Sequence, residues 1–170
     1  MTDSEFRDAF FLNKDVLFRF AWRMTGSQAA AQDIVQDCFL SLWQKPGAFD
    51  ERRGTTRSYL LGIARNLVLK RWRRESRMVE DDEAAPLSCD PVDLVGMERS
   101  DAVASAVQAL PPLQREALIL AEYEEMPLDQ IAAVTGADLA AVKSRLHRAR
   151  QNLRRVLEPL LERSVYGSQR

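Results

Sequence analysis

The residues with the clearest chemical potential are basic side chains gathered between residues 139 and 157. This stretch holds six Lys or Arg residues and the chain's only histidine, and it contains no Asp or Glu. Lys and Arg neutralise DNA phosphates, and Arg also pairs with guanine edges in the major groove. At helical spacing the opposite side is apolar. That apolar side consists of Leu139, Val142, Leu146, Leu153 and Leu157.

The residues around this stretch predict a helix-turn-helix. Asp129 opens a short amphipathic helix, and Gly136 suits the left-handed conformation that ends a helix. Asp138 is a good N-cap for the basic helix. The short helix turns Ile131, Ala132 and Val134 inward. In a helix-turn-helix the second helix enters the major groove. The alternative is an ordinary amphipathic helix whose charge is only solvated.

A second helix, from Thr55 or Thr56 to about Arg77, combines cations with aromatic rings. Its C-terminal half carries Arg65, Lys70, Arg71, Arg73, Arg74 and Arg77, and Tyr59 and Trp72 are interleaved with them. Cations follow phosphates, and rings can stack on unpaired bases. Alternatively, the rings belong to the core and the cations complement the helix C-terminus. For Tyr59 we favour a place in the core. For the basic residues of this helix we favour binding to nucleic acid.

Nothing in the sequence predicts catalysis, a metal site or a cofactor. His147 has no second histidine to work with, and no glycine-rich phosphate loop is present. Glu124, Glu125 and the acids of 80–83 are interpreted as solvated charge. Cys38 and Cys89 make neither a disulfide framework nor a zinc site, so we expect a reducing compartment. With no signal peptide and no long apolar run, a cytoplasmic protein is expected.

The chain as a whole predicts an all-α protein with two small modules. We expect helices over 4–24, 28–44 and 55–77, then an acidic flexible linker over 78–98 with seven acids and no base. Helices over 99–109 and 113–124 and the helix-turn-helix follow, to residue 163, with a disordered tail over 164–170. The side of the second helix expected to be buried is Ile34, Val35, Cys38, Phe39, Leu42 and Trp43. Net charge is only −1, so its distribution matters more than its sum.

Taken together, these stretches resemble a sigma factor of bacterial RNA polymerase, of the small extracytoplasmic function (ECF) class. AWRMTGSQAAAQDIVQDCFLSLW is similar to the segment joining regions 2.1 and 2.2, and FDERRGTTRSYLLGIARNLVLKRWRR to regions 2.3 and 2.4. ALPPLQREALILAEYEEMPLDQIAAVTGADLAAVKSRLHRARQNL is similar to region 4. The resemblance covers nearly the whole chain. It implies a region 2 module over 1–77 and a region 4 module over 99–163.

The resemblance implies three sets of functional residues and no catalytic one. Contacts to the −35 promoter element fall to Lys143, Ser144, Arg145, His147, Arg148 and Arg150. Contacts to the −10 element fall to Arg53, Thr56, Arg57, Tyr59, Asn66, Lys70, Arg71, Arg73 and Arg74. Contacts to core RNA polymerase fall to Asp33, Gln36 and Asp37. Promoter DNA, core polymerase and an anti-sigma factor, often membrane-anchored in this family, are the implied partners, with no small-molecule substrate.

Two departures from the family pattern and two alternative functions accompany this interpretation. Ala140-Ala141 stand where the family usually has Gly-Thr, which removes one hydroxyl near the −35 backbone, and Tyr59 stands where Trp is usual. A conventional helix-turn-helix regulator would bind DNA without polymerase, usually as a dimer. An adaptor would bind a protein through its helices and would not touch DNA.

Overall fold

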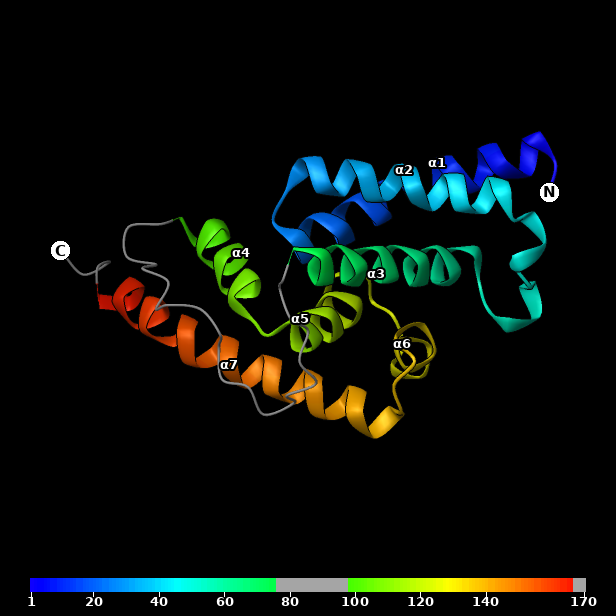
Figure 1. Ribbon diagram of the computed structural model, residues 1–170. Helices are drawn as coiled ribbons and strands as arrows, with labels where there is room; N and C mark the ends of the chain where they lie inside the picture. Colours follow the sequence, from blue (N-terminus) through cyan, green and yellow to red (C-terminus); the bar gives the residue numbers. More distant parts are fainter. Residues whose placement is uncertain (76–97, 167–170) are drawn as a thin grey trace.

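The structure is a computed structural model that describes residues 1–75 and 98–166, with side chains up to residue 160. All regular elements in these ranges are helical, as the sequence predicts (Figure 1). In chain order they are α1 (Asp3–Thr25), α2 (Gln28–Gln44), the 3₁₀ turns η1 (Pro46–Ala48) and η2 (Glu51–Arg53), α3 (Thr56–Arg74), α4 (Arg99–Ala109), α5 (Pro112–Leu118), the π-helical η3 (Ile119–Tyr123), α6 (Leu128–Thr135) and α7 (Leu139–Tyr166). Within the described part, no helix is long and apolar enough to span a membrane.

Helices α1, α2 and α3 pack on one another and form the N-terminal module. Local signals set their ends: Thr2 closes a capping box, Ser27 accepts from the Ala30 backbone N–H, and Thr55 accepts from that of Ser58. Gly26 ends α1 in the left-handed conformation, with φ of 69°. The buried centre of the module consists of Leu17, Phe20, Met24, Ile34, Leu42, Leu60, Leu61 and Val68.

Helices α4 to α7 form the C-terminal module, which contains the predicted helix-turn-helix. Gly136 ends α6 with φ of 68°, and the Asp138 carboxylate accepts from the Ala141 N–H at 2.7 Å, which starts α7. Ile131, Val142, Leu146 and Ala149 are buried between the two helices and their neighbours. The motif therefore has the turn and caps that the sequence predicts.

The two modules are packed against each other, which the sequence analysis did not anticipate. α1 contacts α4 and α5, and α3 contacts α6. The buried apolar residues of both modules form one continuous cluster. In Figure 1 the C-terminal module accordingly lies along one side of the three-helix layer. We call this contact the module boundary.

Three side chains lie where the sequence analysis did not expect them. Trp43, expected to be buried, is 52% exposed, and Leu139, assigned to the apolar side of its helix, is 43% exposed. Both lie near the end of a helix, where fewer neighbouring elements remain to cover a large side chain. Glu124, interpreted as solvated, is only 4% exposed. Its environment at the module boundary explains this, as described below.

The C-terminal tail begins later than the sequence predicts, and the predicted linker is almost entirely outside the described residues. Ser164–Tyr166 were assigned to a disordered tail, but α7 continues to Tyr166. The predicted acidic linker over 78–98 lies outside the described residues, apart from Glu98.

The Cys38 thiol provides a direct test of core burial. It is buried beside the Leu60 carbonyl, and burial, reinforced by Asp37, raises its pKa to about 12. At pH 8 only about one thiol in ten thousand is then ionised, and the thiolate is the reactive form. In a Cys89→Ser variant we expect Cys38 to react with a disulfide reagent at least about 100-fold more slowly in the native protein than in denaturant. Equal rates would show that the core is not closed around it.

Candidate nucleic-acid interface and partner surfaces

The predicted −35 residues lie on α7 and differ in their accessibility. Val142, Leu146 and Ala149 anchor one side of the helix in the core. Lys143, His147 and Arg150 are exposed, whereas Ser144, Arg145 and Arg148 are half-buried. Arg150 donates to the carboxylate of Glu122 on η3. The helix thus presents cations to solvent from a rigid, packed element, which is the arrangement that docking into a DNA groove requires.

A pocket of about 620 Å³ lies between residues 48–55, α3 and α6, and we call it the α3 pocket. Three of the predicted −10 residues line it together, namely Arg53, Tyr59 and Asn66. Tyr59 is half-buried, and its ring packs on Phe49 with centroids 5.4 Å apart, so it both packs and faces the pocket. The volume falls in the range of pockets that hold small organic groups. An unpaired base is one group small enough for this volume.

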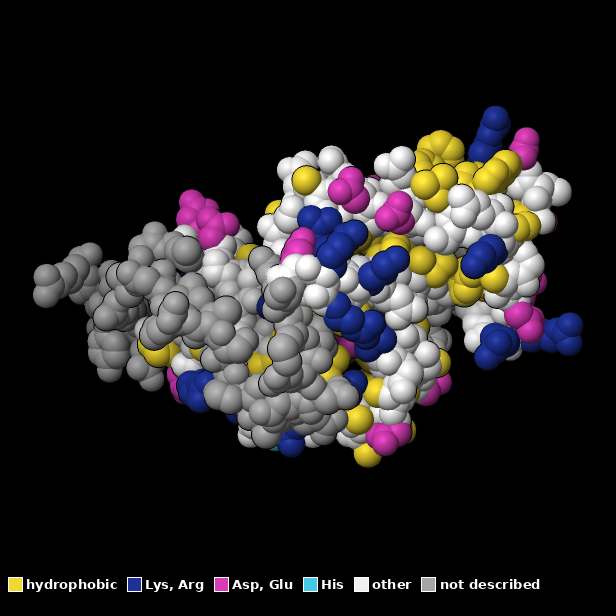
Figure 2. All heavy atoms as spheres, in the orientation of Figure 1, with side chains coloured by type: hydrophobic (Ala, Val, Ile, Leu, Met, Phe, Trp, Pro, Cys, Tyr) yellow, Lys and Arg dark blue, Asp and Glu magenta, His cyan; other side chains and the backbone are white. Residues whose placement is uncertain are grey.

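The remaining predicted −10 residues are distributed elsewhere along α3. Lys70, Arg71 and Arg74 border a second, smaller hollow. The polar residues of α2 that line it are Asp33, Gln36 and Asp37, which are the predicted polymerase contacts. Figure 2 shows basic side chains gathered over this half of α3, with acidic ones beside them. Arg73 is exposed, Thr56 is half-buried at the start of α3, and Trp72 is buried in the core. The structure therefore divides the predicted −10 set into two groups.

Acidic side chains of the C-terminal module hold two arginines of α3. Arg57 donates to the Glu124 carboxylate at 2.8 Å and to the Glu124 carbonyl at 3.0 Å. Arg65 donates to the carboxylate of Glu116, and its side chain is only 14% exposed. Burial raises the pKa of Glu116, while the positive charges of Arg65 and Arg145 oppose that rise. The sequence analysis counted Arg65 among the cations available to nucleic acid and took Glu124 as solvated; both expectations are wrong in this conformation.

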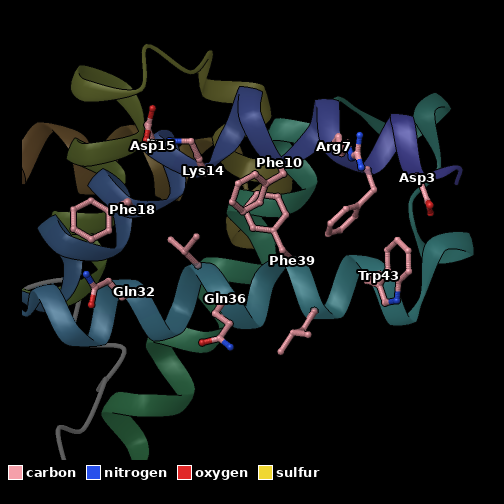
Figure 3. Close-up of a pocket in the computed structure, with 13 residues that line it drawn as sticks. Asp3, Arg7, Phe10, Lys14, Asp15, Phe18, Gln32, Gln36, Phe39 and Trp43 are labelled. Carbon is pink, nitrogen blue, oxygen red and sulfur yellow. Dashed lines mark hydrogen bonds and ion pairs between the residues drawn. The ribbon is translucent and has the colours of Figure 1, made fainter.

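An apolar groove of about 780 Å³ runs between α1 and α2, and we call it the α1–α2 groove. Phe6, Phe10, Phe39 and Trp43 form its aromatic wall, with the Phe6 and Trp43 rings 5.0 Å apart. Figure 3 shows the rings of Phe10, Phe39 and Trp43 between the two helices, and Gln36 also lines the groove. The sequence analysis did not identify this surface. The available signal was an apolar stripe on α2 that is wider than one buried side needs, since it includes both Leu40 and Trp43.

Comparisons with known proteins match the N-terminal module and the C-terminal module to two separate families. Residues 12–78 match the family described as Sigma-70 region 2, and residues 100–153 match the family described as Sigma-70, region 4. The chain is 31% identical over 150 residues to the ECF RNA polymerase sigma factor SigL of Mycobacterium tuberculosis, a match that covers 85% of this chain and 84% of SigL. The chain belongs to the ECF family of RNA polymerase sigma factors.

This ECF sigma factor is also similar to a second curated relative and to a solved structure. It is 32% identical over 147 residues to SigE of Mycolicibacterium smegmatis, covering 82% of this chain but only 56% of SigE. Its fold is similar, with a TM-score of 0.73 and 27% identity, to the sigma factor RpoE crystallised in complex with the anti-sigma factor NepR from Bartonella quintana. That similarity covers 91% of this chain and 97% of RpoE. The all-α fold and the resemblance drawn from the sequence are thus confirmed.

The family matches do not reach every surface of this ECF sigma factor. The region 2 match begins at residue 12, so Phe6 and Phe10 of the α1–α2 groove precede it. The α3 pocket includes residues from both matches, because Gln130, Ala133 and Val134 of α6 complete its lining. No comparison tests the roles of individual residues, which remain predictions.

Proposed function

We propose that this ECF sigma factor binds core RNA polymerase and directs it to promoters through −35 and −10 recognition. The observation that carries the proposal is the presentation of Lys143 and His147 to solvent on the firmly packed second helix of a helix-turn-helix, within the region 4 match. The α3 pocket supports the second half of the proposal. A separated −10 base would enter it beside Tyr59 and Asn66, while Lys70, Arg73 and Arg74 hold the adjacent backbone.

The proposed mechanism uses binding energy to open DNA. Residues 99–163 dock α7 at −35 and residues 1–77 trap unpaired −10 bases, so the melted form of the duplex is the one that binds best. Polymerase carries out the synthesis, and the sigma factor itself needs no catalytic residue. The place of action is then the cytoplasm, where RNA polymerase works.

Run-off transcription tests this function. A template is first obtained by mapping the RNA 5′ ends that appear when the protein is overproduced. Core polymerase with the purified protein should start at a defined position on that template, and core polymerase alone should not. Absence of specific starts would refute the proposal, and a gel shift of duplex DNA without polymerase would favour the conventional regulator instead.

Substitutions on α7 test the −35 contacts. Arg145→Ala and Arg148→Ala should each weaken −35-dependent initiation by about 1–3 kcal/mol, or roughly 5- to 150-fold, because each removes a base or phosphate contact. Lys143→Ala should act mainly by reducing the salt dependence of binding. Arg154→Ala is the matched control, since Arg154 is exposed on the same helix outside the predicted set. Unchanged footprints in all three variants would mean that the readout lies elsewhere.

We also propose that an anti-sigma factor controls this protein. The support is the likeness to RpoE, which was crystallised with the anti-sigma factor NepR. A genuine inhibitor should bind the purified chain and abolish run-off initiation, and added core polymerase should compete with it. A binding protein that leaves initiation intact would not qualify.

A further inference from the structure

A pocket of about 790 Å³ lies between the C-terminal end of α1 and helix α4, and we call it the α1–α4 pocket. Most of its lining side chains are apolar or uncharged. Trp22, Val103 and Tyr123, three large apolar side chains that are more than a third exposed, line it together. Single exposed apolar side chains are ordinary, whereas several that gather in one concave surface indicate a binding site.

The charged side chains of the α1–α4 pocket all have the same sign. Arg23 and Arg99 line it, and its described lining residues include no Asp or Glu. The α1–α2 groove differs, because two acids there balance two basic residues. The first turn of α4, at Arg99 and Ser100, also lines the α1–α4 pocket, and the N-terminus of a helix adds partial positive charge. This pocket therefore attracts an anion, and its apolar walls suit an organic one.

Arg23 is the side chain best placed to pair with such an anion. Its guanidinium lies 4.1 Å from the centre of the Tyr123 ring, and this contact holds it at the pocket wall. The Nη1 atom of Arg23 is buried, and no described residue supplies a hydrogen-bond acceptor for it. A buried donor without an acceptor is unfavourable, and a carboxylate can satisfy two guanidinium donors at once. A carboxylate that reaches Arg23 would therefore supply the missing acceptor.

We propose that the α1–α4 pocket binds an organic carboxylate with an apolar body, of the kind that a medium-chain fatty acid provides. The carboxylate pairs with Arg23 near the first turn of α4, and the apolar body lies against Trp22, Val103 and Tyr123. Because α1 and α4 both line the site, a bound ligand also stabilises the folded protein by mass action. This site does not rest on the proposed function, so failure of run-off transcription would leave it standing.

The first test compares octanoate with 1-octanol, which has the same chain length but no charge. Both are titrated into the full-length protein by isothermal titration calorimetry at low salt. We expect one octanoate to bind saturably, with a dissociation constant of about 1 mM or below. 1-Octanol should bind at least about tenfold more weakly, because it cannot form the charge-assisted pair with Arg23. Absence of saturable octanoate binding, or equal binding of the alcohol, would overturn the inference.

Two variants locate the octanoate site. Arg23→Gln should weaken octanoate binding at least about tenfold and leave 1-octanol binding unchanged. Its matched control is Arg19→Gln, since Arg19 is exposed on the same helix and does not line the pocket. Ala104→Trp, at an exposed position of α4 that lines the pocket, should fill the site and abolish binding of both ligands. Circular dichroism verifies that each variant is folded.

Thermal unfolding provides a second readout of the same site. Octanoate at about ten times its dissociation constant should raise the unfolding midpoint of the parent and of Arg19→Gln by about 3–6 °C. It should not raise the midpoint of Ala104→Trp. Full octanoate binding by both Arg23→Gln and Ala104→Trp would show that the ligand binds elsewhere. Loss of octanoate binding in Trp43→Ala, with Arg23→Gln unaffected, would place it in the α1–α2 groove and overturn the inference.

Discussion

Trp43→Ala should weaken binding to core RNA polymerase by about 2–4 kcal/mol, roughly 30- to 1000-fold, measured by titration of labelled protein with core enzyme. Trp43 is a half-exposed aromatic residue on the wall of the α1–α2 groove, and Gln36, a predicted polymerase contact, lines the same groove. Large rings that fill a partner's pocket dominate the energy of protein interfaces. We therefore expect the apolar groove, more than the flanking charges, to supply the affinity.

Trp22→Ala is a matched control for Trp43→Ala. Trp22 is 51% exposed, but it lies near the C-terminal end of α1 and outside the α1–α2 groove. It should leave polymerase affinity within about threefold of the parent. Asp37→Ala should weaken polymerase binding less than Trp43→Ala does, because exposed charge pairs contribute little. Equal effects of the two tryptophan substitutions would show that the groove is not the docking surface.

Phe20→Ala should lower the free energy of unfolding by about 3–5 kcal/mol, measured by chemical denaturation followed by circular dichroism. Phe20 is fully buried among α1, α2 and α3, so truncation loses apolar burial and leaves a cavity that the surrounding helices cannot fill. This is a large part of the stability of a small domain. Because one apolar cluster joins both modules, we expect a single unfolding transition to report the loss.

Phe11→Ala provides the comparison for Phe20→Ala, since Phe11 is on the same helix and 67% exposed. We expect a change below about 1 kcal/mol there. A similarly small change for Phe20→Ala would mean that the three-helix core is much looser than the structure shows. A large change for both would point to loss of α1 itself rather than of core packing.

The helices could be predicted closely because their signals are local. Ser27, Thr55 and Asp138 cap helices with hydrogen bonds that span only three residues, and Gly136 relieves a strained turn by itself. The periodic apolar residues of α7 similarly depend only on helical geometry. The predicted −35 residues all lie on α7, so the same local signals placed them together on one helix. The roles assigned to them still await the experiments above.

The residues placed wrongly depend on partners far away in the chain. Glu124 is buried because Arg57, 67 residues earlier, supplies its counter-charge, and Arg65 is withdrawn from solvent by Glu116, 51 residues later. Trp43 stays 52% exposed although its ring packs on Phe6 of α1, 37 residues earlier in the chain. Periodicity identifies which side chains share a helix face, but it does not identify what that face meets.

The amino-acid sequence by itself determined the helices, their caps, the helix-turn-helix and the resemblance to ECF sigma factors, because each depends on neighbouring residues or on motif order. Only the tertiary structure decided that the two modules close on each other, that α6 covers the α3 pocket, and that an apolar groove opens between α1 and α2. These features depend on contacts between distant segments, whose free energy has no counterpart in any local pattern.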